Sequence, residues 1–241
     1  MGSRRETKSL RQKAFGSRTC DIGPHPLHEI AVYSHITSEA CFHSWYEIIF
    51  VRFENIMMDK DKIKAAVRML LEGIGEDPDR QGLTETPERV ARMCEEIFGG
   101  LYEDPGEHLA KQFFAPESEL VIEKDIVFYS TCEHHLLPFF GKVHIAYIPD
   151  GKIAGLSKLP RTVEAFARRP QIQEQMTVQI ADAIERYLSP KGVMVMVEAE
   201  HTCMTMRGVK KPGVMTVTTA TRGLYKDDFE RQRLFLETVR S

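Results

Sequence analysis

Two short clusters of cysteine and histidine could bind a metal ion. The first is the string Cys-Glu-His-His at 132–135, and the second is His-Thr-Cys at 201–203. A Cys-x-x-His spacing lets a thiolate and an imidazole reach one ion from a single turn. If the second cluster ends a strand, the period of two puts His201 and Cys203 on the same face. Either cluster alone is a weak signal, but a pair of strands that brought them together would make a metal site.

The number of ligands indicates the kind of chemistry. Cys132, His135 and Cys203 would give zinc three protein ligands and leave a fourth position free, which is the pattern of catalytic zinc sites. Zinc lowers the pKa of water from about 15.7 towards about 7, so hydroxide becomes available at neutral pH. His134 and His201 remain for proton transfer, because the unperturbed pKa of imidazole is about 6.5.

Other interpretations of these residues stay open at this point. Taken singly, each cysteine or histidine is explained at least as well as a core residue or a hydrogen-bonded structural group. A structural zinc knuckle requires a fourth Cys or His at short spacing, and none follows Cys203. A zinc-dependent interaction module is disfavoured by the same missing ligand and by the lack of a basic face.

The composition is that of an ordinary globular protein. Of 241 residues, 42% are hydrophobic and 28% are charged, and 32 Lys+Arg against 35 Asp+Glu give a formal net charge of -3. This balance disfavours a nucleic-acid partner bound through bulk positive charge. No run of about 18 apolar residues is present, so no membrane span is expected. Five widely spaced cysteines favour a reducing, cytoplasmic location over a disulfide framework.

The chain divides into three predicted regions. Residues 1–57 are predicted to form an N-terminal extension of unknown role, either disordered or not native, because they show no sustained helical or strand period. One hypothesis is that the native chain starts at Met57-Met58 and that the extension is not native. Residues 58–118 form a helical region, and residues 119–241 form the catalytic domain.

Two helices are predicted in the region 58–118. The first begins near Asp59 and ends near Gly73, with its apolar residues on one face. In the second, Thr86 is the predicted N-cap and Pro87 occupies the first helical position. This helix ends at Gly99-Gly100. Cys94 lies on the apolar face of the second helix, which favours a core role over a redox role.

The region 119–241 is predicted to combine four strands with three helices. The strands cover residues 120–129, 142–148, 193–197 and 214–220, with helices beginning after a Ser157 cap, at Pro170 and after an Asp227-Asp228 cap. This order is typical of an α+β fold with an antiparallel sheet. An open four-stranded sheet has two unpaired edges, which favours oligomerisation through the edges.

Several basic residues accompany the two clusters, namely Lys158, Arg161, Arg207, Arg89 and Arg92. Most lysines and arginines are solvated surface residues, and the residue types alone indicate no further role for these five. No Gly-x-x-x-x-Gly-Lys loop is present, so a nucleotide would not be held in the P-loop manner.

Five strings along the chain form a recognisable set: Thr-Pro-Glu-Arg-Val-Ala at 86–91, Cys-Glu-His-His at 132–135, Gly-Leu-Ser-Lys at 155–158, Arg-Pro-Gln-Ile-Gln-Glu at 169–174, and His-Thr-Cys-Met-Thr-Met-Arg-Gly at 201–208. Through these strings the sequence resembles the GTP cyclohydrolase I family, from about Asp59 to the end of the chain. All five occur in the order of the family, which makes the match specific.

The resemblance implies an activity: hydrolysis and rearrangement of GTP to 7,8-dihydroneopterin triphosphate and formate. It implies zinc ligands at Cys132, His135 and Cys203, and catalytic imidazoles at His134 and His201. It implies recognition of guanine by Glu174 with Gln173 beside it. The triphosphate would be held by Ser157, Lys158, Arg161, Arg207, Arg89 and Arg92.

The resemblance also implies an assembly. In the tunnelling fold of the family, hairpins of neighbouring chains join into a barrel, and two pentamers stack into a decamer. Active sites then lie at subunit junctions, so the helix that carries Arg89 would serve a site in another chain. A member of the same fold that binds zinc or a pterin without turnover is the remaining alternative, and the presence of His134, His201 and Glu174 counts against it.

Overall fold

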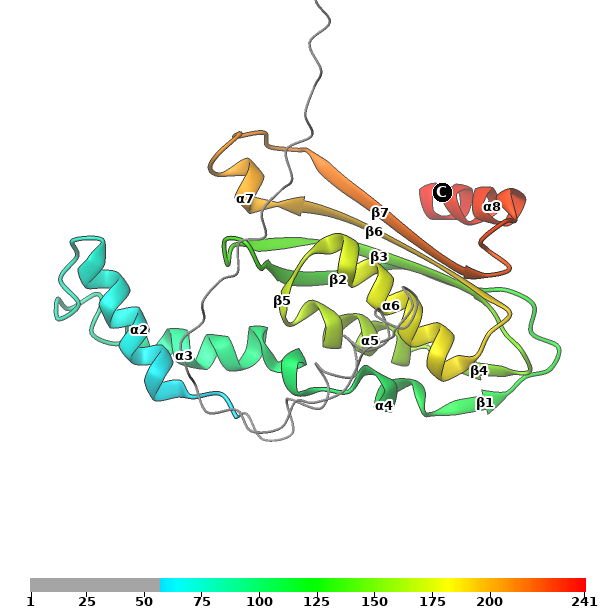
Figure 1. Cartoon of the computed structure of the whole chain (residues 1–241), viewed down its shortest axis with the longest axis horizontal. Helices are drawn as coiled ribbons and strands as arrows, with labels where there is room; N and C mark the ends of the chain where they lie inside the picture. Colours follow the sequence, from blue (N-terminus) through cyan, green and yellow to red (C-terminus); the bar gives the residue numbers. More distant parts are fainter. Residues whose placement is uncertain (1–56) are drawn as a thin grey trace, which may run out of the picture. The chain divides into compact units, whose positions relative to one another are not determined.

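The computed structural model describes residues 57–241, which belong to one compact unit, Asn55–Ser241. Apart from Met57, the predicted N-terminal extension lies outside the described residues. Helices and strands alternate along the unit in an α+β arrangement (Figure 1). Among the described residues, none of the helices combines the length and the hydropathy that a membrane crossing requires.

Helices α2 (Lys60–Gly73) and α3 (Thr86–Ile97) form the first part of the unit. Asp59 caps α2 by accepting a hydrogen bond from the backbone of Lys62. The prediction of Thr86 as N-cap of α3 is wrong: the N-cap is Glu85, and Thr86 already lies within the helix. The helix starts one residue early because Pro87 needs no backbone partner in the first turn.

A short connection links α3 to the sheet. It contains the 3-10 helix η1 (Gly99–Tyr102), helix α4 (Pro105–Leu109) and strand β1 (Gln112–Phe114). Strand β1 pairs antiparallel with β4 (Lys152–Ala154), a two-stranded sheet that the sequence analysis did not predict. Strands of three residues carry too little periodicity to be recognised.

The main sheet has five strands in the order β5-β2-β3-β6-β7. Four of them are antiparallel neighbours: β2 (Val121–Cys132), β3 (Pro138–Ile148), β6 (Gly192–His201) and β7 (Met215–Gly223). They confirm the four predicted strands, each of which is longer than predicted. The strands run on into polar residues because ladder hydrogen bonds do not require apolar side chains.

The prediction that a helix begins at Pro170 is wrong. Pro170 and Gln171 form strand β5, which pairs parallel with the end of β2. Helix α6 (Gln173–Leu188) begins three residues later. Proline lacks a backbone N–H, which is tolerated in an edge strand because one side of that strand makes no ladder hydrogen bonds. Pro170 therefore begins a short edge strand here, although the same residue type is also common at helix starts.

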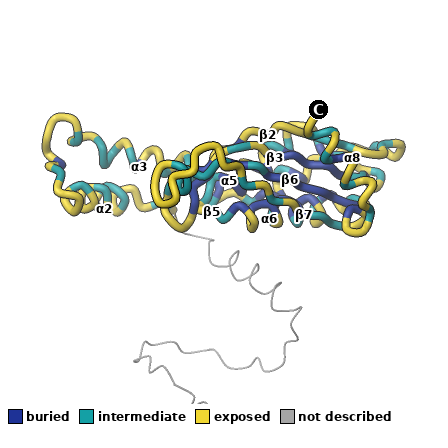
Figure 2. Tube along the Cα trace, turned by 90° about the horizontal axis from the view of Figure 1, so that it is seen from above, coloured by how far each residue is buried: buried dark blue, intermediate teal, exposed yellow. Residues whose placement is uncertain are grey.

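The core lies mainly between the sheet and two helices. Helices α5 (Lys158–Ala167) and α6 pack on one face, and α8 (Phe229–Arg240) packs on the other (Figure 1). Residues alternate along β3 accordingly: Ile145 and Tyr147 face α5 and α6, whereas Ala146 contacts the cluster beneath α8. Figure 2 shows the deepest burial along the central strands β3 and β6. Ser157 precedes α5 without making a side-chain cap bond, whereas Asp228 caps α8 as predicted.

Candidate metal centre and active site

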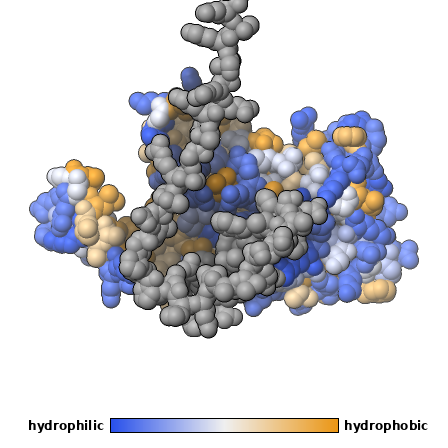
Figure 3. Space-filling model, in the orientation of Figure 1, coloured by the Kyte–Doolittle hydropathy of each residue, from blue (hydrophilic) through white to orange (hydrophobic). Residues whose placement is uncertain are grey.

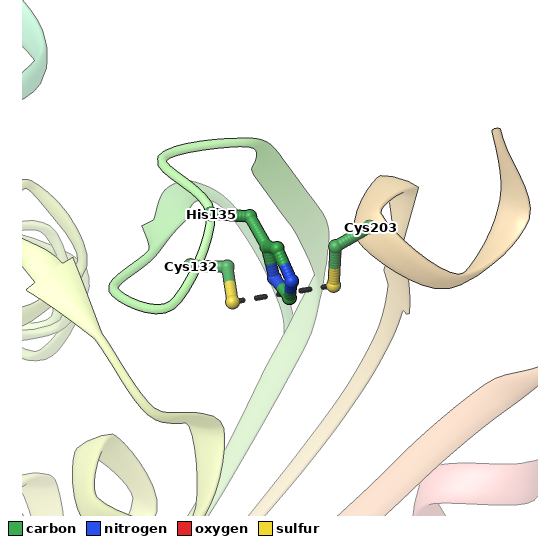
Figure 4. Close-up of side chains that lie close together, drawn as sticks. All are labelled: Cys132, His135 and Cys203. Atoms are coloured by element: carbon green, nitrogen blue, oxygen red, sulfur yellow. Dashed lines mark hydrogen bonds between the residues drawn. The ribbon is translucent and has the colours of Figure 1, made fainter. Parts of the chain in front are cut away.

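Three side chains converge where strands β2 and β6 end. Cys132 is the last residue of β2, and His135 lies in the turn that follows (Figure 4). The turn is closed by two hydrogen bonds, from the Cys132 N–H to the Leu137 carbonyl and from the Leu136 N–H to the Cys132 carbonyl. Leu136 has a positive φ of 52°, which reverses the chain within this turn. Cys203 comes from helix α7 (Thr202–Thr205).

The geometry of the three side chains fits one divalent ion. The ligand atoms of Cys132, His135 and Cys203 lie within 4.8 Å of one another, and the two Sγ atoms are 4.0 Å apart. Two thiolates on a tetrahedral zinc ion would be about 3.8 Å apart, given a Zn–S distance of about 2.3 Å. Two sulfurs and an imidazole nitrogen are also the donor set that zinc prefers.

The prediction that His201 and Cys203 share one face of a strand is wrong. Strand β6 ends at His201, and the chain turns into α7 immediately afterwards. The helical turn of α7, and not a continuation of the strand, brings the Cys203 thiol beside Cys132. Cys132, His135 and Cys203 are therefore grouped as expected, but the strand periodicity is not the reason.

The electrostatics of the thiols indicate what an ion would have to supply. Partial burial, together with the neighbouring Cys132, raises the pKa of the Cys203 thiol. Without a cation the thiol therefore stays protonated at neutral pH. A bound divalent cation reverses this preference, because its charge stabilises the thiolate directly.

His201 lies against this cluster in a fixed position. Its ring stacks on that of Phe139, with a centroid distance of 4.5 Å and an interplanar angle of 3°. Its Nε2 lies 2.8 Å from Oε1 of Gln173. Burial lowers the pKa of His201, while the carboxylate of Glu174 opposes that effect, so the neutral ring is favoured at pH 7. A neutral, held imidazole is suited to accept a proton.

His134 is more loosely placed than His201. Its side chain is exposed, its Nδ1 lies 3.9 Å from the Cys132 Sγ, and its ring is edge-on to that of His135. It does not belong to the cluster of three ligand atoms. The position beside the cluster leaves it free to move a proton at the site.

Among the predicted substrate-binding residues, Glu174 and Arg207 lie near the cluster. Glu174 is exposed in the first turn of α6 and is near enough to His201 to influence its pKa. A guanidinium nitrogen of Arg207 lies 3.1 Å from Nε2 of His135. Gln173 differs from its neighbour, since its side chain is only 1% exposed and contacts His201 rather than open solvent.

The other predicted substrate-binding residues lie apart from the cluster in a single chain. Within residues 57–241, no hydrogen bond or ion pair joins the cluster to Ser157, Lys158, Arg161, Arg89 or Arg92. Ser157 and Lys158 lie at the start of α5, with Arg161 one turn on. Arg89 and Arg92 pair with glutamates on or just before α3, Glu85 at 2.6 Å and Glu88 at 3.8 Å.

Phe139 contributes to the site through its contact with His201, and no sequence motif predicts that role. Phe139 is fully buried and lies directly opposite His201 in the pairing of β3 with β6. Its role depends on strand register, which pairs residues 62 positions apart, so local sequence carries little signal for it.

The arrangement defines a class of protein: an α+β protein with an open three-ligand site suited to a hydrolytic metal ion. Comparison with known proteins then identifies the family. The family described as GTP cyclohydrolase I matches residues 63–240, and the chain belongs to this family.

Individual relatives agree. The chain is 62% identical over 183 residues to the GTP cyclohydrolase 1 of Clostridium kluyveri, covering 76% of this chain and 99% of the relative. It is 64% identical over 170 residues to that of Carboxydothermus hydrogenoformans, covering 70% and 88%. The apo crystal structure of the archaeosine synthase QueF-Like has 21% identity and a TM-score of 0.37, covering 44% of this chain and 94% of its own, a likeness too weak to bear on function.

Proposed function

We propose that this protein hydrolyses and rearranges GTP to 7,8-dihydroneopterin triphosphate and formate, the first step of pterin and folate biosynthesis. The observation that carries the proposal is the convergence of Cys132, His135 and Cys203, in a member of this family, on positions that fit one ion. Zinc is the ion that the two sulfurs and one imidazole favour.

The roles of the surrounding residues follow from chemistry and position. The zinc ion, when bound, supplies a Lewis acid that makes hydroxide available at neutral pH. His201 and His134 hold or move protons as the imidazole ring of guanine opens at C8, so that charge on the ring is neutralised as it forms. Glu174 accepts two hydrogen bonds from the N1–H and exocyclic amino group of guanine, which a carboxylate can do with its two oxygens.

The triphosphate is assigned to the basic residues. Arg207 lies beside His135, and Ser157, Lys158 and Arg161 lie at the start of α5. Arginine and lysine bind phosphate with charge-assisted hydrogen bonds. Their binding energy aligns the base with the metal centre, which converts affinity for a remote group into catalysis.

We further propose the tunnelling fold, with hairpins of neighbouring chains joined into a barrel and two pentamers forming a decamer. Two features support it. Strand β7 ends the sheet and β2 pairs with β5 through only two residues, so both edges of the described sheet offer free backbone groups. Helix α2 exposes Met69 and Leu70, its C-cap Ile74 is also exposed, and apolar side chains gather on the lobe at the left of Figure 3.

The assembly would also bring Arg89 and Arg92 to the active site of a neighbouring chain. Both lie on α3 and make no contact with the cysteine–histidine cluster of their own chain, so they would bind the triphosphate held by that neighbour. We place the protein in the cytoplasm, because Cys94, Cys132 and Cys203 are free thiols. GTP is the proposed small-molecule partner, with no nucleic acid or membrane as a partner.

The direct experiment incubates the purified protein with GTP, with and without a chelator. Formate release and pteridine absorbance are followed together. We expect both in the zinc-containing protein and neither after chelation, with recovery when zinc is returned. Zinc or pterin binding without formate would favour the non-catalytic alternative and contradict the proposal.

A further inference from the structure

The side chain of Gln173 is a buried polar group that links α6 to two strands. Its Nε2 lies 3.1 Å from the carbonyl oxygen of Val197 in β6 and 2.9 Å from that of Thr216 in β7. Carbonyl oxygens only accept hydrogen bonds, so the nitrogen of the carboxamide must face them. The oxygen of the carboxamide must therefore face the other way.

A chain of hydroxyl groups agrees with this orientation. The hydroxyl of Thr177 donates to the backbone carbonyl of Gln173 at 2.8 Å. Thr177 therefore accepts from the hydroxyl of Thr218, which lies 2.6 Å away. The Thr218 oxygen is then free to accept from Nε2 of Gln173 at 3.2 Å, sharing one of the two Nε2 hydrogens with a carbonyl oxygen. Every donor in the network has an acceptor in one consistent direction.

The orientation of Gln173 fixes the protonation of one ring nitrogen of His201. The carboxamide Oε1 lies 2.8 Å from His201 Nε2 and can only accept, so Nε2 carries a hydrogen. In the neutral ring the lone pair is then on Nδ1. Stacking on Phe139 holds the plane of the ring. Within residues 57–241, no protein group hydrogen-bonds to Nδ1, so this nitrogen is left for a ligand.

We propose that Gln173 is a positioning residue that fixes the Nε2–H tautomer of His201 and so presents Nδ1 as the nitrogen that exchanges a proton with the substrate. The inference rests on the proposed role of His201 in proton transfer. It changes the part given to Gln173 by the family resemblance, from a guanine-binding side chain to one that acts through His201. The wrong tautomer would present an N–H where the reaction needs a lone pair, which costs rate rather than binding.

The test compares Gln173→Met with Thr218→Val in the zinc-containing protein. Methionine fills the space without an acceptor for His201, whereas Thr218→Val removes a partner of the same carboxamide and leaves the contact with His201 in place. Solid-state 15N spectra of histidine-labelled protein report the tautomer of His201, assigned with a His201→Asn sample. We expect Nε2–H in the wild type and in Thr218→Val, and a mixture of tautomers in Gln173→Met.

Kinetics give the second readout. We expect kcat of Gln173→Met to fall about 10- to 100-fold, by analogy with the partners that orient metal-site histidines, with KM within about threefold of the wild type. If Gln173→Met is too unstable to isolate, Gln173→Asn, which withdraws the oxygen by one methylene, carries the same expectation.

Three outcomes would overturn the inference: an Nδ1–H tautomer in the wild type, an unchanged tautomer in the Gln173 variant, or equal kinetic losses in the Gln173 and Thr218 variants. A protein that shows the expected tautomers but never releases formate from GTP would contradict the proposed function instead. The spectra do not depend on turnover, so the two failures are distinguishable.

Discussion

At the scale of single residues, the candidate site depends on groups that are close in space and far apart in the chain. Cys132 and His135 share one turn, whereas Cys203 lies 71 residues beyond Cys132. Each candidate ligand is held by a different kind of local structure: Cys132 by the end of a strand, His135 by a turn and Cys203 by a short helix. Losing one thiolate would leave two ligands, which is too few to retain zinc tightly.

The ligand role of Cys203 is tested by Cys203→Ser. We expect zinc content well below about one ion per chain and no measurable turnover, because a serine hydroxyl is a poor zinc ligand. His134→Ala is the matched variant, since His134 lies beside the cluster without belonging to it. It should retain zinc, measured by plasma mass spectrometry, and lose activity. Equal zinc loss in both variants would reassign His134 as a ligand.

The role of Glu174 is tested by Glu174→Gln. The amide can no longer accept both hydrogen bonds from guanine, so we expect kcat/KM for GTP to fall about 10- to 100-fold, as for a lost hydrogen bond to a charged group. The melting temperature should stay unchanged, because Glu174 is exposed. Glu185→Gln, an exposed glutamate on the same helix, is the control for a general charge effect. An unchanged rate for Glu174→Gln would remove it from the guanine pocket.

At the scale of elements, strand β2 contains a shift in its pairing register, and a buried histidine accepts a hydrogen bond from the backbone there. The pairing of β2 with β3 shifts between Glu123 and Ile126, and Asp125 adopts a positive φ of 62°. The Asp125 N–H donates to Nδ1 of His144, which is 1% exposed, at 3.2 Å. Since Nδ1 accepts, the neutral ring carries its hydrogen on Nε2, 3.5 Å from a carboxylate oxygen of Glu198.

This element predicts a pH dependence of stability. Burial lowers the pKa of His144 below 6.5, although Glu198 and Asp125 oppose that effect. The folded state therefore favours the neutral ring, and the unfolded chain takes up the proton first as the pH falls. The contribution of His144 is complete above about pH 6.5 and declines as the pH falls from there towards the lowered pKa.

The measurement compares the wild type with His144→Asn, which keeps an acceptor near the Nδ1 position and cannot titrate. Urea unfolding at pH 7.5 and at pH 5 gives the free energy of unfolding of each protein. We expect the difference between the wild type and the variant to shrink at the lower pH. A difference that is constant, or that grows on acidification, would show that His144 is not held neutral.

At the scale of the whole molecule, the chain separates residues that the proposed reaction needs together. All three candidate metal ligands come from one chain, whereas Arg89 and Arg92 lie on α3 and pair with glutamates. In the proposed decamer these arginines serve a neighbouring site. Two variants that are each inactive could then complement one another, because a mixed oligomer would contain some complete active sites.

Mixed oligomers provide the test. Cys203→Ser lacks a complete metal site, and the double variant Arg89→Ala, Arg92→Ala lacks only the arginines. If sites are shared, co-refolded mixtures should regain activity with GTP although each variant alone is inactive. A mixture of Cys203→Ser with Cys132→Ser should regain none, because both ligands belong to the same chain. Absence of recovery in the first mixture, with mixed oligomers confirmed by mass spectrometry, would place the complete site within one chain.

Local patterns predicted much of this fold and reached their limit at particular residues. The apolar runs of β2, β3, β6 and β7 exceed the length at which β character is visible, so all four strands were expected. The helix start predicted at Pro170 is wrong because proline is compatible with both a helix start and an edge strand. Which of the two forms depends on whether β2 offers a free edge, and that is a property of the packed sheet.

The same division holds for the site. The sequence by itself determined the candidate ligands and imidazoles, because residue type and close spacing are local properties. Only the tertiary structure decided that α7, rather than a continued strand, brings Cys203 to Cys132, and that Gln173 contacts His201 from within the core. Both depend on strand register and helix placement, which are set by burial of side chains distant in the chain, and no local spacing encodes them.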